Sequence, residues 1–106
     1  MSYAENMITF RAMFGRNMPD GLEVSDAAMT NYLKAVDRVF DCYTVTDTVG
    51  IWKGDRELSF IIEITVPVSE EYLTGHKLAA LAELYKLEFD QEAVFITKTH
   101  TSGWFV

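Results

Sequence analysis

The sequence predicts one α+β domain over residues 1–106, a four-stranded antiparallel sheet with two helices on one face. Three observations predict this fold. Apolar residues alternate along four segments, which is the period of half-buried strands, and recur at helical spacing along two others. These segments follow one another in the order β-α-β-β-α-β, the ferredoxin-like split pattern. A chain of 106 residues is also short enough for only one hydrophobic core.

The first strand and the first helix carry clear local signals. Residues 7–14 alternate between apolar and other side chains along their length. Residues 15–21 combine two glycines, an asparagine and a Pro-Asp pair, which predicts a loop. Ser25 predicts the start of a helix, because its hydroxyl can accept a hydrogen bond from an amide of the first turn. Apolar residues then recur at helical spacing as far as Phe40.

A hairpin and a second helix follow. Residues 42–53 are rich in β-branched and aromatic types, residues 57–66 alternate, and the short polar turn between them predicts a hairpin. Ser69 predicts the cap of the second helix, whose regular part we expect to begin only near His76 because Gly75 interrupts it.

The chain closes on one more strand. Residues 93–98 are apolar and β-branched and predict the fourth strand. Residues 99–106 predict a tail with room for a short edge strand.

The two faces of the predicted sheet differ in composition. The core face of segment 57–66 would carry Phe60, Ile62, Ile64 and Val66, and the opposite face Glu57, Ser59, Ile61, Glu63 and Thr65. Met7 and Met13 join the second face from the first strand. Two helices can cover only one face, and a surface that mixes methionine and isoleucine with single carboxylates is typical of a subunit interface. We therefore expect a homo-oligomer.

Composition excludes several classes of function. Sixteen acidic against nine basic residues give a net charge of −7, which argues against a nucleic-acid partner and leaves a cationic ligand, a basic protein or simple solubility. No apolar run is long enough to span a membrane, and the N-terminus lacks the basic flank of a signal peptide, so we expect a cytoplasmic protein. Cys42 is alone, which excludes an internal disulfide, and we expect it to be a small buried residue.

Standard catalytic motifs are also missing. The sequence contains neither a Walker loop nor a G-x-G-x-x-G fingerprint. His76 and His100 are far apart and have no cysteine or acidic cluster beside them, so we expect no metal site. Ser102 follows His100 closely, but residues this near in an extended segment point in diverging directions, so we expect no serine nucleophile. What remains is a group of carboxylates and aromatic residues in and around the hairpin.

Each of these hairpin residues has a structural and a functional interpretation. Glu63 lies in the middle of an apolar strand, where it is either paired with a lysine or arginine across the sheet or part of a site. Glu57 is either a solvent-facing strand end or a functional carboxylate. Trp52 either packs or offers a surface for stacking. Spacing alone leaves these alternatives open.

Three segments resemble a known family. Thr99–Gly103 follows an apolar strand as a His-Thr-small-Gly tail, the hairpin carries Gly50, Trp52 and Glu57, and Phe14 has Arg16 nearby. In these features the chain resembles the phage-encoded S-adenosylmethionine (SAM) lyases, formerly called SAM hydrolases. The residues FGRNMPDG and the Gly-x-Trp hairpin are also similar to a group of small bacterial ferredoxin-like proteins, a resemblance that would leave function open.

The lyase resemblance implies a specific reaction. Members of that family convert SAM to 5′-methylthioadenosine and L-homoserine lactone with no metal or added cofactor, because the carboxylate of the substrate attacks its own γ-carbon. The resemblance also implies a homotrimer with substrate held between subunits, and a role in SAM depletion or anti-restriction in the cytoplasm of the host bacterium.

The resemblance further implies roles for individual residues. Glu57 would be the catalytic carboxylate that accepts hydrogen bonds from the substrate ammonium. Glu63, on the same strand face, is the alternative, although the coliphage member carries a basic residue at that position. The expected substrate-binding residues are Tyr43, Trp52, Glu63, Arg16, His100, Thr101 and Ser102, of which Arg16 would otherwise brace the first loop.

Two functions of other classes stay open. A small acidic protein can inhibit a DNA-binding enzyme by presenting carboxylates in place of phosphates, although the acidic residues here are interspersed. A protein that binds SAM without turnover would share the same pocket chemistry. Fold does not decide between these functions.

Overall fold

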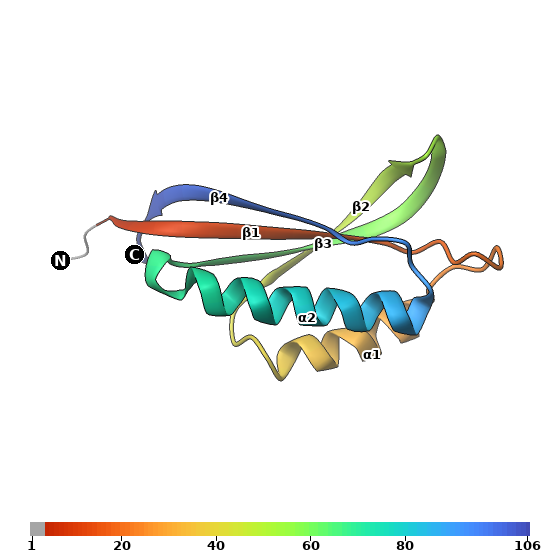
Figure 1. Cartoon of the computed structure of the whole chain (residues 1–106), viewed down its shortest axis with the longest axis horizontal. Coiled ribbons are helices and arrows are strands. Elements are labelled where there is room, and N and C mark those ends of the chain that lie inside the picture. The colour runs from red at the N-terminus through yellow and green to blue at the C-terminus, as the bar shows by residue number, and fades with distance from the viewer. Residues whose placement is uncertain (1–3) are drawn as a thin grey trace.

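The computed structural model describes residues 4–106. It confirms the predicted fold class: four antiparallel strands form one sheet in the order β2-β3-β1-β4, and both helices lie on one face of it (Figure 1). The elements are β1 (Glu5–Gly15), α1 (Asp26–Asp37), β2 (Thr44–Trp52), β3 (Asp55–Pro67), a single 3₁₀ turn (Val68–Glu70), α2 (Glu71–Phe89) and β4 (Phe95–Gly103).

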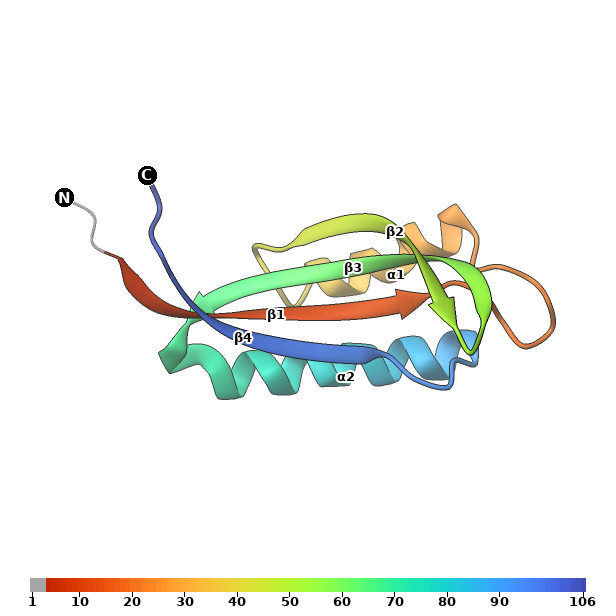
Figure 2. The same cartoon turned by 90° about the horizontal axis from the view of Figure 1, so that it is seen from above.

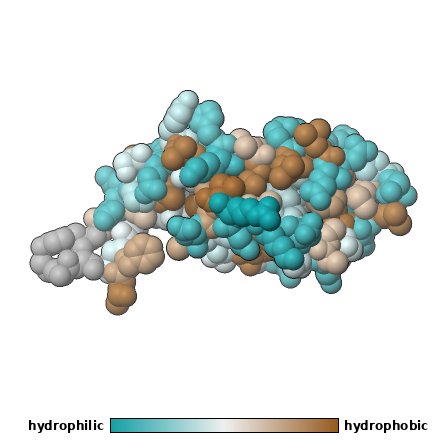
Figure 3. All heavy atoms as spheres, turned by 90° about the horizontal axis from the view of Figure 1, so that it is seen from below, coloured by the Kyte–Doolittle hydropathy of each residue, from teal (hydrophilic) through white to brown (hydrophobic). Residues whose placement is uncertain are grey.

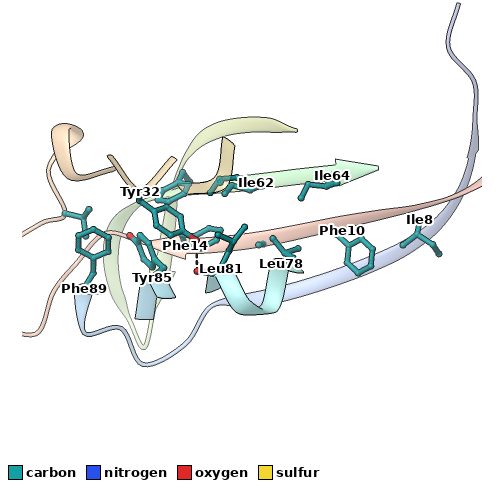
Figure 4. Packing of buried hydrophobic residues seen from close by; sticks show 14 residues of the cluster. Ile8, Phe10, Phe14, Tyr32, Ile62, Ile64, Leu78, Leu81, Tyr85 and Phe89 are labelled. Carbon is teal, nitrogen blue, oxygen red and sulfur yellow. Dashed lines mark hydrogen bonds between the residues drawn. The ribbon is translucent and has the colours of Figure 1, made fainter. Parts of the chain in front are cut away.

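The core lies between the sheet and the two helices, on the face that the sequence predicts. Phe60, Ile62 and Ile64 of β3 are buried there beside the alternate residues of β1. Phe14 stacks on Phe60 with a ring separation of 4.8 Å, and Tyr85 of α2 meets both rings edge-on (Figure 4). Aromatic pairs in this geometry stabilise a core beyond the area they bury.

The first helix begins as predicted. The Ser25 hydroxyl accepts a hydrogen bond from the Ala28 amide at 3.1 Å, which satisfies one of the free amides of the first turn of α1. Arg16, although charged, is buried in front of this cap. Its guanidinium donates to the Val24 carbonyl at 2.9 and 2.7 Å and pairs with Asp26 at 2.7 Å. These contacts fasten the loop after β1 to the start of α1.

The prediction for the second helix is wrong at its start. α2 begins at Glu71 rather than near His76, and Ser69 lies in the 3₁₀ turn and does not cap the helix. A single glycine lowers helix stability by only about 1 kcal/mol, and α2 continues through Gly75 because the turns around it pack on the sheet, with Thr74 and Leu78 buried. The Phe10 ring of β1 lies beside this glycine, where a Cβ would be 3.4 Å from the ring.

The prediction for the last strand is wrong at both ends. β4 covers Phe95–Gly103, so residues 99–103 continue the strand instead of forming a separate tail. They pair with the first residues of β1, from Thr99 opposite Thr9 to Gly103 opposite Glu5. Without β4, the backbone groups on this edge of β1 would have no strand partner. Cys42 is also exposed rather than buried.

The β2–β3 hairpin extends beyond the rest of the sheet. β1 stops pairing with β3 at Gly15 and Ser59, whereas β2 and β3 stay paired as far as Trp52 and Asp55. The free end curls away from the helices (Figure 1). Seen from above, its tip lies over the segment after α2 (Figure 2), and the Lys53 side chain at the tip reaches Glu92 of that segment.

The two helices of the described part of the chain form a surface layer of the domain, each with one buried side. No helix within residues 4–106 is both long and apolar enough to cross a bilayer. Seen from the side that carries the helices, hydrophilic and hydrophobic residues are interspersed over the surface (Figure 3).

Candidate functional site

A groove of about 720 Å³ lies under the curled hairpin. Three segments that are distant in sequence enclose it: the hairpin, the end of β1 with the following loop, and residues 90–95 between α2 and β4. Its volume falls within the range of small-molecule sites, roughly 300 to 1,000 Å³. Of the predicted site residues, Trp52 and Glu57 line this groove.

The backbone from Gly15 to Asn17 holds the Glu57 carboxylate at one side of the groove, and we call this segment the backbone seat of Glu57. Its Oε2 accepts a hydrogen bond from the Asn17 amide at 3.2 Å. Its carboxylate also lies directly against Gly15, where a Cβ would be 2.5 Å from Oε1 and 2.7 Å from Oε2. No side chain larger than hydrogen fits at that position without moving the carboxylate, so Gly15 is required by this close approach.

The backbone that seats Glu57 is itself held by α2, by the residue Gln91 that follows this helix, and by β3. The Tyr85 hydroxyl donates to the Gly15 carbonyl at 2.6 Å, and the Gln91 side-chain amide donates to the Asn17 carbonyl at 2.7 Å. The Arg16 amide between them donates to the Leu58 carbonyl at 3.0 Å. The segment below the carboxylate is therefore fixed at three points.

The hairpin tip is tied to the far wall of the groove by one carboxylate. Glu92 Oε2 accepts from Lys53 Nζ at 2.8 Å and from the Trp52 indole nitrogen at 3.3 Å. The Lys53 ammonium also lies 5.6 Å from the centre of the Trp52 ring. The Lys53 hydrogen bond and charge lower the pKa of the Glu92 carboxyl, so it stays ionised at neutral pH.

The groove has an acidic and apolar lining. Among the described residues that line it, four are acidic (Asp55, Glu57, Asp90 and Glu92) and none is basic. Trp52, Met13, Ile61 and Phe95 contribute apolar surface. This combination favours an organic cation, since the carboxylates attract the charge and the aromatic and aliphatic groups accept the rest of the molecule. No group of three or more potential metal ligands occurs within residues 4–106.

The other predicted site residues lie outside the groove. Tyr43 precedes β2 at the end opposite to Trp52, about 30 Å away along an extended strand. Its hydroxyl donates to Asp37, and burial together with this bond raises the pKa of Tyr43 to about 12. Glu63 pairs across the sheet with Arg11 at 3.6 Å, as the structural interpretation expected. Arg16 faces Val24 and Asp26.

His100, Thr101 and Ser102 are also separate from Glu57 within one chain. Thr101 pairs with Met7, eight residues along β1 from Gly15, which corresponds to about 26 Å. All three residues are exposed on the edge strand β4. Within one chain they therefore do not line the groove that holds Glu57.

Sequence reasoning missed three contributors to the site. Gly15 and Asn17 act through backbone atoms, which leave no signature in residue type beyond the glycine itself. Glu92 follows a helix in a polar stretch, where an exposed acid is ordinary. Only the bend of the hairpin brings it to Trp52, 40 residues away.

Removing the Glu92 carboxylate should loosen the hairpin tip. In Glu92→Ala we expect the Trp52 indole N–H resonance to move and amides of the tip to exchange faster, while the unfolding midpoint stays nearly constant because both ionic partners are exposed. In the parent protein the same resonance should move on acidification, because the lowered pKa of Glu92 means that the contact is present at neutral pH and is lost as the pH falls through that pKa.

Glu83→Ala is the matched control for this change. Glu83 pairs with Lys86 at 3.1 Å on the surface of α2 and has no contact with the hairpin. It should leave the Trp52 resonance and its pH dependence unchanged. An unchanged chemical shift of the Trp52 indole N–H in Glu92→Ala would contradict the hydrogen bond between Trp52 and Glu92.

Comparison with known proteins places the chain in a family and in a structural group. Residues 10–105 match the model of the family described as "Protein of unknown function (DUF3574)". No curated protein matches the sequence significantly. A phage SAM lyase in complex with S-methyl-5′-thioadenosine is similar in structure, with a TM-score of 0.68 and 19% identity over 93% of this chain and 88% of that chain.

A phage SAM lyase in the apo state is similar too, with a TM-score of 0.55 and 16% identity over 92% of this chain and 87% of that one. The resemblance to phage SAM lyases that the sequence motifs indicated is thus confirmed as a similarity of fold. Because the family model covers nearly all of the sequence, this chain belongs to the DUF3574 family.

Proposed function

We propose that this protein cleaves SAM to 5′-methylthioadenosine and L-homoserine lactone. The observation that carries the proposal is the acidic and apolar groove that holds Glu57 on a backbone seat, in a fold that spans 93% of the chain and is similar to a phage SAM lyase. That lyase was solved with S-methyl-5′-thioadenosine, which is one of the two products that the proposed reaction would release.

The reaction requires the protein only to bind SAM in a suitable conformation and to complement its charges. The carboxylate oxygen of SAM forms a bond to its own γ-carbon while the bond from that carbon to sulfur breaks. The bonding electron pair stays on sulfur, which becomes a neutral thioether. No proton is transferred and no redox partner is needed. Catalysis then consists of holding the carboxylate and the γ-carbon in line.

Different residues of the groove would bind different parts of SAM. Glu57 accepts hydrogen bonds from the substrate ammonium and holds the amino-acid arm in its curled shape. The Trp52 ring stacks on adenine or faces the sulfonium. Asp55 and Asp90 raise the local concentration of a substrate that carries a cationic sulfur, while the charge of Glu92 is balanced by Lys53. Apolar walls limit the water that would solvate the attacking carboxylate.

The experiment for this function is direct. Purified protein is incubated with SAM, and the products are followed by mass spectrometry. Methylthioadenosine that forms together with homoserine lactone supports the lyase. Homoserine with no transient lactone would indicate hydrolysis by water instead. Saturable binding of intact SAM in calorimetry, without any product, would identify a non-catalytic SAM-binding protein and overturn the proposal.

Gly15→Ala should uncouple activity from stability. The new Cβ would lie 2.5 Å from the Glu57 carboxylate, which must move, but a carboxylate at the end of a flexible side chain moves at little cost to the fold. We expect turnover of SAM to fall at least tenfold, or about 1.4 kcal/mol of barrier, with a nearly unchanged urea midpoint.

Gly103→Ala is the control, since nothing lies within 4 Å of a Cβ at that position. It should retain turnover within about twofold. Full activity in Gly15→Ala would show that the position of the Glu57 carboxylate does not matter.

Assembly into a homotrimer belongs to the same proposal. The sheet face that the helices leave open carries the half-buried Met13 and Ile61 and the exposed Phe95. A neighbouring copy on this face would exclude water from the groove and could bring the β4 residues His100, Thr101 and Ser102 to it. Light scattering at assay concentration should give about three times the chain mass. A monomeric mass in an active sample would contradict the shared site.

A further inference from the structure

Two buried tyrosines make the same kind of hydrogen bond with different consequences. The Tyr32 hydroxyl donates to the Leu81 carbonyl at 2.7 Å, and the Tyr85 hydroxyl donates to the Gly15 carbonyl at 2.6 Å. The two rings are neighbours in the core, with centres 4.9 Å apart (Figure 4). Leu81 lies inside α2, whereas Gly15 ends β1 and touches the Glu57 carboxylate.

The Gly15 carbonyl controls the orientation of the seat. Because a peptide group is planar, fixing this carbonyl also fixes the Arg16 amide that follows it. The next amide, that of Asn17, donates to Glu57 at 3.2 Å. Only two peptide groups, Gly15–Arg16 and Arg16–Asn17, therefore connect the Tyr85 hydroxyl to the Asn17 amide that holds the Glu57 carboxylate.

Tyr85 is suited to act as a permanent donor. Burial raises its pKa well above the usual value for a phenol, and the charge of Glu57 raises it further, while Arg16 acts in the opposite direction. The hydroxyl stays protonated throughout the physiological pH range. Gln91 supports the same backbone from the other side through the Asn17 carbonyl.

We infer that Tyr85 is a positioning residue for the Glu57 carboxylate, which it orients through the backbone from Gly15 to Asn17. It does not touch the substrate. For its effect on turnover this inference rests on the proposed function. The position of the carboxylate itself can be tested without any reaction.

Tyr85→Phe and Tyr32→Phe form a matched pair. Each removes one hydroxyl from the core and leaves one backbone carbonyl without its donor, so both should lower the urea midpoint by a similar small amount. We expect turnover of SAM to fall at least fivefold in Tyr85→Phe and to stay within twofold of the parent in Tyr32→Phe.

A double-mutant cycle separates positioning from general destabilisation. If Tyr85 acts through Glu57, then Glu57→Gln should reduce turnover at least threefold less in the Tyr85→Phe background than in the parent. In the Tyr32→Phe background the reduction should be the full parental one. Equal reductions in both backgrounds would overturn the inference.

A nuclear magnetic resonance measurement decides the question independently of activity. In the parent protein Glu57→Gln should shift the Asn17 amide proton, because a neutral amide oxygen is a weaker acceptor than a carboxylate. We expect this shift to be at least halved in Tyr85→Phe and unchanged in Tyr32→Phe. Equal shifts in both variants would overturn the positioning role. If SAM is not turned over, the proposed function fails and this comparison still gives an answer.

Discussion

Glu57→Gln is expected to lower the turnover of SAM at least tenfold, which corresponds to about 1.4 kcal/mol of activation free energy. The substitution keeps the size of the side chain and an oxygen for the Asn17 amide. It removes the negative charge that would hold the substrate ammonium and places an N–H donor in the same region. Initial rates of methylthioadenosine formation at several SAM concentrations provide the measurement.

Glu63→Gln is the control on the same strand. It makes the same chemical change about 20 Å away, at a carboxylate that pairs with Arg11 in the open face of the sheet. Turnover should stay within about twofold of the parent. Undiminished activity in Glu57→Gln would remove Glu57 from the site, and a loss confined to Glu63→Gln would transfer the role to Glu63.

Phe14→Ala is expected to cost about 3–5 kcal/mol of the free energy of unfolding. Phe14 is fully buried, stacks on Phe60 and contacts the rings of Tyr32 and Tyr85, so truncation would leave a cavity at the centre of the aromatic cluster. Such a cost is a large fraction of the stability of a domain of this size. Urea unfolding followed by far-UV circular dichroism measures it.

Phe105→Ala provides the comparison, because that ring is 87% exposed and its removal should change the free energy of unfolding by no more than about 0.5 kcal/mol. A loss below about 1 kcal/mol in Phe14→Ala would mean that the cluster repacks around the missing ring.

Local periodicity predicted the elements and the buried face of the sheet. The alternation in 57–66 places Phe60, Ile62 and Ile64 on one side, and the structure buries these residues against the helices. A side-chain period of two leaves only one register that hides this set from water. Ser25 likewise predicted the start of α1, because its hydroxyl accepts a hydrogen bond from the Ala28 amide three residues later.

The errors occurred where a distant contact overrides local preference. Gly75 has a low helix propensity, yet α2 runs through it because the neighbouring Thr74 and Leu78 are buried against the sheet. Residues 99–103 look like a polar tail, yet they form a strand because β1 supplies pairing partners 90 to 98 residues earlier in the chain. Neither contact can be read from the segment itself.

In the candidate site, too, the sequence indicated some of the functional side chains but not the distant contacts that position them. Residue type and strand position were enough to single out Glu57 and Trp52, because a carboxylate and an aromatic ring carry their chemistry in their own atoms. Their surroundings come from tertiary structure alone. The Asn17 amide meets Glu57 across 40 residues, Glu92 meets Trp52 across 40, and the Tyr85 hydroxyl meets Gly15 across 70. A seat made of backbone atoms has no residue signature, so it exists only once the hairpin, β1 and α2 have packed together.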